Sequence, residues 1–166
     1  MKMTVYDRIL LYLFEYKEHR NDPQMPQSIT QQGLAKGVGI TVTHVPRSVG
    51  KLVRQGLALE VGAHVVGAQR KKKTYHLTHA GVVACLEMRE RLERMECVYS
   101  EGGDSGARTM TLAKMQEAVK HRCGKEGRPI PTLFEVLSAM GDGNELRFEQ
   151  IIGATGGPKK SDSDGL

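Results

Sequence analysis

The side chains best suited to chemistry in this sequence are cations that gather in one stretch. Between Arg20 and Val82 the chain has nine Lys and Arg residues, and only Asp22 and Glu60 oppose them. A concentrated positive field is the usual footprint of a polyanionic partner, most often a nucleic acid. The sequence therefore predicts a phosphate-contacting surface in this part of the chain.

The composition excludes several other classes of protein. The 166 residues include 24 Lys and Arg against 19 Asp and Glu, with 15 basic and 9 acidic residues up to Val98. No apolar run approaches the roughly 18 residues of a membrane span. Three widely spaced cysteines argue against a disulfide framework. We therefore expect a cytoplasmic protein that carries its positive charge in the N-terminal part.

No constellation of residues predicts catalysis, a metal or a cofactor. Gly103–Gly106 superficially resembles the nucleophile segment of chymotrypsin-like proteases, but it lies in a Gly-rich linker of a mostly helical sequence. His76–His79 and His121–Cys123 come nearest to metal-ligand spacing, yet neither has the second ligand pair of a structural zinc site. We therefore expect no enzyme activity.

The elements around the cations predict a helix-turn-helix. A first helix is expected over Val5–Lys17, and Thr30 is expected to cap a short second helix that ends near Gly39. A third helix is expected from about residue 43 to residue 55, with Pro46 in its first turn. Its apolar face is formed by Val45, Val49 and Leu52.

A β-hairpin is expected directly after these helices. Leu57–Val66 and Thr74–Leu77 are predicted strands, and the basic run Arg70–Lys73 forms a cationic arm between them. Three helices followed by a basic hairpin are the order of a winged helix-turn-helix. The predicted fold class is mainly α with a small β-hairpin, and a C-terminal helical appendage completes it.

The third helix and the arm supply the candidate contacts to double-stranded DNA. A helix of this diameter fits the major groove, and the Arg47 guanidinium can form a bidentate contact with guanine. The candidate base or groove contacts are Thr43, His44, Arg47, Ser48 and Lys51. The candidate phosphate contacts, on the backbone or over the minor groove, are Lys36, Arg54, Arg70, Lys71, Lys72 and Lys73. Alternatively, the helix only packs and its charges are solvated.

Two stretches resemble known regulators. Gln31–Ile40, Thr43–Arg47 and Leu52–Leu57 resemble the helix-turn-helix core of MarR-like prokaryotic regulators. His64–Gly81 is similar to the wing of archaeal winged-helix proteins. The resemblance covers roughly residues 5–98 and implies sequence-specific DNA binding in transcription regulation, usually as a homodimer.

The remaining sequence predicts a dimerisation helix and an appendage. A long helix over Thr78–Tyr99 carries a heptad seam, and its candidate dimerisation residues are Met88, Leu92 and Met95; packing within the chain is the alternative. Three helices are expected over the ranges Thr109–Arg122, Thr132–Met140 and Glu145–Ile152. The predicted units are residues 1–98, a helical appendage over 99–152 and a disordered tail over 153–166.

Two other functions stay open at this point. Winged helices also serve as protein-interaction adaptors, and the near-neutral appendage could dock a protein partner. An effector or redox signal could instead act through the appendage, with Cys97 and Cys123 as the candidate redox-responsive thiols and Cys85 expected to be buried.

Overall fold

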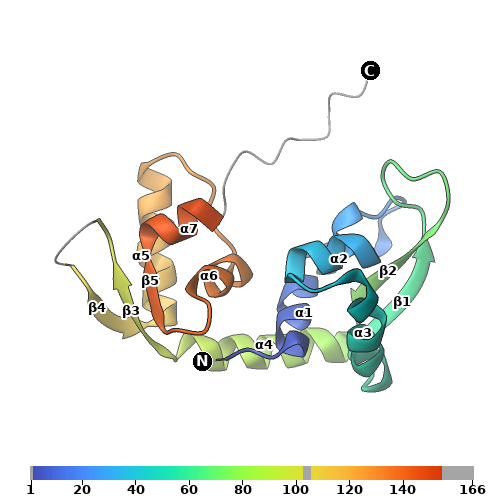
Figure 1. Cartoon of the computed structure of the whole chain (residues 1–166), viewed down its shortest axis with the longest axis horizontal. Coiled ribbons are helices and arrows are strands. Elements are labelled where there is room, and N and C mark those ends of the chain that lie inside the picture. Colours follow the sequence, from blue (N-terminus) through green and yellow to red (C-terminus); the bar gives the residue numbers. More distant parts are fainter. Residues whose placement is uncertain (1, 103–105, 155–166) are drawn as a thin grey trace. The chain divides into compact units, whose positions relative to one another are not determined.

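The structure is a computed structural model that describes residues 2–102 and 106–154, and the chain forms two compact units, Met1–Glu93 and Arg94–Leu166 (Figure 1). The boundary lies between Glu93 and Arg94, whereas the sequence placed it after Val98. The disordered tail is expected from residue 153, but residues 153 and 154 belong to the last helix; the remainder, from residue 155 onward, lies outside the described residues, as does most of the Gly103–Gly106 segment. Among the described helices, none has the length and apolar character that crossing a membrane requires.

Three helices form the first part of the N-terminal unit: α1 (Val5–Phe14), α2 (Gln31–Val38) and α3 (Val45–Arg54). Thr30 caps α2, because its hydroxyl accepts the N–H of Gly33 at 3.2 Å, and Gly39 ends the helix at φ 74°. The first helix is shorter than expected. A separate 3₁₀ turn, η1 (Lys17–Asn21), takes up the residues that follow α1.

The three helices pack together through apolar faces. All three contact one another, and α3 buries the predicted apolar face of Val45, Val49 and Leu52. Tyr12 of α1 lies over Gly37, where a Cβ would overlap its ring, and its hydroxyl donates to the Ser28 carbonyl at 3.1 Å. This close approach requires glycine at position 37.

The hairpin forms between β1 (Ala58–Ala63) and β2 (Lys72–Leu77), which pair antiparallel. The strand β1 is shorter than the predicted Leu57–Val66. The strand β2 is longer than the predicted Thr74–Leu77, because Lys72 and Lys73 belong to it and not to the arm. Beyond the paired strands the loop is fixed to the residue Met25. The Met25 N–H donates to the His64 carbonyl at 2.8 Å, and the Val66 N–H donates to the Met25 carbonyl at 3.0 Å.

The helix after the hairpin, α4 (His79–Glu93), ends earlier than predicted. The expectation of one helix to Tyr99 is wrong, because residues Glu96–Ser100 form strand β3. In β3 the buried side chains alternate, at Cys97 and Tyr99, which is the period of a strand and not of a helix. The predicted heptad seam is therefore interrupted: Met95 lies beyond α4, and Leu92 is buried within the chain.

The C-terminal unit is not purely helical, contrary to the prediction. It contains a three-stranded sheet of order β4-β3-β5, in which β4 (Arg108–Thr111) pairs antiparallel and β5 (Glu145–Arg147) pairs parallel with β3. Three helices are present as expected: α5 (Leu112–Lys125), α6 (Leu133–Met140) and α7 (Phe148–Ala154). Strands β4 and β5 occupy residues where the predicted helices Thr109–Arg122 and Glu145–Ile152 begin. These residues are extended because they pair with β3 on its two sides.

The start of α4 generates a stability prediction. The Thr78 hydroxyl accepts the N–H of Gly81 at 3.0 Å, and a Cβ at Gly81 would overlap the Leu57 carbonyl oxygen. We expect Gly81→Ala to lower the free energy of unfolding by about 1–3 kcal/mol, measured by urea denaturation, because backbone must move. Gly50→Ala in α3 is the matched control, since its Cβ meets only the flexible Arg54 side chain. Equal effects of the two substitutions would contradict the packing argument.

Candidate nucleic-acid interface

The polar face of α3 lies at the surface, opposite its buried apolar face. Arg47 and Lys51 project from α3 as exposed side chains, and Ser48 is half-buried. Thr43 and His44 are also exposed, but they belong to a short 3₁₀ turn, η3 (Val42–His44), that precedes the helix. The five candidate base contacts therefore divide between two adjoining elements, and none lies in the core.

The start of α1 lies beside this face. The Lys51 ammonium is 4.0 Å from the centroid of the Tyr6 ring, a cation–π distance. A cavity of about 300 Å³ adjoins it and is lined by Val5, Tyr6, Ile40, His44, Arg47 and Ser48. Sequence reasoning did not find Tyr6, because a single aromatic residue on another helix carries no signal of what it contacts.

A second cavity joins the hairpin to the helix-turn-helix. It has a volume of about 290 Å³, and it is lined by Thr30, Gln31, Gln32, Val42, Lys72 and Lys73. The Gln31 side chain donates to the Val42 carbonyl at 3.1 Å and ties the start of α2 to η3. Two candidate phosphate contacts on β2 are thus brought next to the turn that holds the first candidate base contacts.

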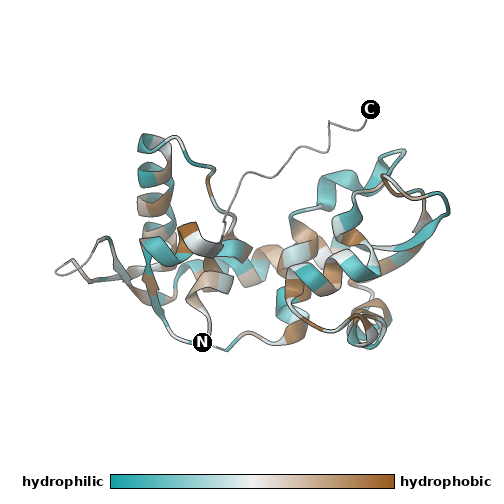
Figure 2. Ribbon diagram, turned by 45° about the horizontal axis from the view of Figure 1, so that its top comes forward, coloured by the Kyte–Doolittle hydropathy of each residue, from teal (hydrophilic) through white to brown (hydrophobic). Residues whose placement is uncertain are grey.

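The other candidate phosphate contacts are dispersed over the surface. Lys36 is exposed in the last turn of α2 and Arg54 in the last turn of α3, while Arg70 and Lys71 are exposed in the hairpin loop. Figure 2 shows hydrophilic colours along part of the hairpin, to which β2 contributes more than the largely apolar β1. These four cations therefore come from three separate elements and do not form one cluster.

Both acidic residues of the cationic stretch have partners nearby. The Asp22 carboxylate lies 2.7 Å from Nδ1 of His19, and Glu60 pairs with Lys73 at 3.4 Å across the hairpin. Both pairs are partly exposed, so each contributes little to stability. Asp22 and Glu60 are the only acidic residues between Arg20 and Val82, and both are engaged in these pairs. Within the described part of the chain, Arg47 and Lys72 form no ion pair.

A buried polar pair lies at the base of the hairpin. The Thr74 hydroxyl donates to the Val61 carbonyl at 2.9 Å and lies 2.8 Å from His76 Nε2. Because the hydroxyl has only one hydrogen, the imidazole donates to it, which is a role open to neutral histidine. Burial, with a smaller contribution from Arg20, lowers the pKa of His76 below its ordinary value of 6.5.

The cysteines and histidines do not form a reactive or metal site in the described residues. All three cysteines are free and buried, and burial raises the pKa of each thiol, that of Cys85 to about 11. A raised thiol pKa disfavours the reactive thiolate, which argues against the redox role considered for Cys97 and Cys123. Within residues 2–102 and 106–154, no group of three His, Cys, Asp or Glu side chains could hold a metal ion.

Some solved structures are similar to this chain at low sequence identity. No family model and no curated protein matches the chain. Similar solved structures include MepR, a transcription regulator of the Staphylococcus aureus multidrug efflux pump MepA (18% identity, 75% of this chain and 68% of that chain, TM-score 0.42). A ZitR mutant from Lactococcus lactis is also similar, with 21% identity over 76% of this chain and 67% of that chain and a TM-score of 0.44. The Campylobacter jejuni peroxide stress regulator has 15% identity over 86% of this chain and 87% of that chain and a TM-score of 0.30. By its own elements the fold is mainly α, and the first unit has the three helices and following hairpin of a winged helix-turn-helix.

The buried imidazole predicts how stability depends on pH. Because the pKa of His76 is lower in the folded than in the unfolded chain, the unfolded chain binds this proton first. The contribution of His76 to the free energy of unfolding is complete above pH 6.5 and is lost as the pH falls below that value. We expect wild-type unfolding free energy to decline more steeply from pH 7.5 to about 5.5 than that of His76→Gln. Urea denaturation across this range measures both, and parallel curves would contradict the assignment.

Proposed function

We propose that the chain is a sequence-specific, double-stranded DNA-binding transcription regulator. The observation that carries this proposal is the exposed polar and cationic face of α3, preceded by the η3 turn that adjoins the Lys72–Lys73 cavity. The buried face of α3 holds the helix at the surface, where it can enter a major groove. The hairpin loop, fixed to Met25, would present Arg70 and Lys71 to the sugar–phosphate backbone.

The candidate residues would divide into two roles. Thr43, His44, Arg47, Ser48 and Lys51 would contact base edges or position α3 in the groove, with Arg47 as the bidentate contact to guanine. Lys36, Arg54 and the four residues Arg70–Lys73 would contact phosphates. Because Lys73 already pairs with Glu60, we expect it to contribute less than Lys72.

These roles predict different effects of two sets of substitutions. We expect Arg47→Ala to weaken binding to a selected site by about 1–3 kcal/mol and to relax the preference for that site. Lys71→Ala combined with Lys72→Ala should weaken all duplexes similarly and flatten the dependence of log affinity on log salt, by about 0.9 for each phosphate that is no longer neutralised. Fluorescence anisotropy of labelled duplexes across a salt series measures both effects.

The control for these measurements is Lys114→Ala, which removes an exposed lysine of α5. It should leave affinity and salt dependence unchanged. If Arg47→Ala and the double lysine variant behaved identically, the division of roles would be wrong. Wild-type protein that binds no duplex even at low salt would contradict DNA binding and favour the protein-interaction adaptor.

We infer further that the chain acts as a homodimer through α4. Its exposed large apolar side chains are Val83 and Leu86, 41% and 51% exposed, on a different face from the buried Leu92. In an antiparallel pair of α4 helices that sets Val83 against Leu86, His79 would lie opposite Glu90, because each is one turn away. This face replaces the predicted seam of Met88, Leu92 and Met95.

Substitution on this face tests the dimer. We expect Leu86→Glu to convert a dimer of wild-type mass into a monomer, because a carboxylate would be buried against apolar side chains. Size-exclusion chromatography with light scattering measures the mass. Val66→Glu, at a comparably exposed apolar residue of the hairpin loop, is the control and should stay dimeric. A monomeric wild type, or a dimeric Leu86→Glu, would refute this interface.

A further inference from the structure

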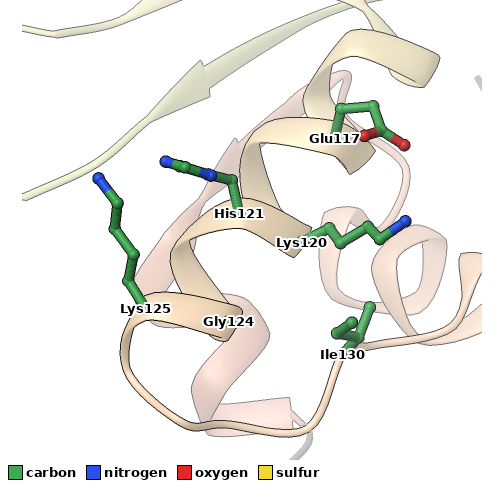
Figure 3. A pocket seen from close by; sticks show the side chains of 6 residues that line it. All are labelled: Glu117, Lys120, His121, Gly124, Lys125 and Ile130. Atoms are coloured by element: carbon green, nitrogen blue, oxygen red, sulfur yellow. The ribbon is translucent and has the colours of Figure 1, made fainter.

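The C-terminal unit has an open cavity of about 500 Å³ over the last turns of α5. Its lining residues are Glu117, Lys120, His121, Gly124, Lys125 and Ile130. Figure 3 shows His121 and Lys125 projecting along one flank of α5, and Lys120 and Ile130 along the other. Gly124 lies between the two flanks and has no side chain, so the cavity floor is open there.

The cavity is positively charged and its lysines have no partners in the described chain. Lys120 and Lys125 form no ion pair with a described residue, and Glu117 is the one carboxylate among the lining residues. The neighbouring arginines differ in this respect. Arg122 and Arg128 both pair with Glu126, at 3.1 and 2.7 Å. The unpaired cations of this helix end are therefore the ones that face the cavity.

Most carbonyl groups at the end of α5 already accept a hydrogen bond within the chain. The carbonyls of a helix C-terminus ordinarily repel anions. Here the Arg128 N–H donates to the Cys123 carbonyl at 2.8 Å, and the Glu126 N–H donates to the Arg122 carbonyl at 3.0 Å. The Gly124 carbonyl accepts the N–H of Gly127, which has a φ of 64°. Three carbonyl oxygens of the last turn of α5, those of Arg122, Cys123 and Gly124, are therefore engaged by N–H groups of the chain.

Ile130 adds an apolar contact to the cationic site. Its side chain is 54% exposed, the largest exposed fraction of any large hydrophobic side chain in the described part of the protein. Pro129 and Pro131 flank it and restrict the local backbone. The chain thus holds an isoleucine at the cavity with low conformational freedom and without burying it.

We propose that this cavity binds a small organic anion that joins a carboxylate or phosphate to an apolar group. Lys120, on the flank that faces Ile130, pairs with the anionic group, and Lys125 and His121 add positive charge and a hydrogen bond from the other flank. Ile130 contacts the apolar group, and Gly124 leaves space for the ligand. Binding does not depend on DNA, but its interpretation as an effector site rests on the proposed function.

Titration of the full chain with matched probes tests the proposal by ¹⁵N–¹H correlation spectroscopy. The organic anions are phenyl phosphate and phenylacetate, inorganic phosphate supplies the charge alone, and benzyl alcohol supplies the ring alone. We expect saturable shifts at the amides of Gly124, Lys125 and Ile130 with at least one organic anion. Binding of the two partial probes should be weaker by about tenfold or more. Comparison of the two organic anions distinguishes a phosphate from a carboxylate ligand.

Two results would overturn the proposal. Equal binding of inorganic phosphate and both organic anions would indicate an adventitious ion only. Shifts confined to α3 and the hairpin, or no saturable shift, would exclude the site. Because the spectrum is recorded without DNA, failure of DNA binding leaves this test unaffected.

A cavity-filling variant provides the matched test. A Cβ at Gly124 would meet no atom within 4 Å, and the position is helical, so Gly124→Leu should fold and fill the cavity. We expect Gly124→Leu to weaken binding of the organic anion by about tenfold or more. Lys120→Ala combined with Lys125→Ala should weaken binding to a similar extent. Gly153→Leu in α7 and Lys114→Ala should bind as wild type. Unchanged binding by Gly124→Leu would refute the site.

Discussion

The structure of the N-terminal unit depends on the burial of one side of α3. Val45, Val49 and Leu52 are almost completely buried, and α3 contacts both α1 and α2. Burying each of these side chains contributes roughly 1.5–3 kcal/mol. Because a helix is rigid, fixing this stripe also fixes the direction of the opposite face. The exposure of Arg47 and Lys51 thus follows from apolar packing, with no contact of their own required to hold the helix.

The hairpin depends on a second constraint, its attachment to the preceding loop. A two-stranded hairpin is marginally stable alone. Here Met25 pairs with the segment beyond β1, Gln27 donates to the Val66 carbonyl at 2.9 Å, and Thr30 bridges Thr74. The buried Thr74–His76 pair lies beneath these contacts. A cationic hairpin held in this way can present its charges at a defined position.

The two units differ in where their charge remains unpaired. In the N-terminal unit, Asp22 and Glu60 are engaged by His19 and Lys73, and cations around α3 face solvent. In the C-terminal unit, Glu126 engages two arginines while Lys120 and Lys125 face a cavity. Local pairing therefore selects which cations are free for a ligand. Net charge alone would not distinguish the two sites.

The sequence by itself determined the elements whose signals are local. Thr30 and Gly39 mark the ends of α2, and the spacing of Val45, Val49 and Leu52 defines the inner face of α3. It failed where pairing between distant residues overrides local periodicity. The stretch Glu96–Ser100 continued a helical pattern, yet it pairs with β4 and β5, and no local signal reports those partners. Tertiary structure alone decided that Leu92 is buried, that Tyr6 contacts Lys51, and that Ile130 lies beside Lys120. Each of these depends on segments that meet only after the chain has folded.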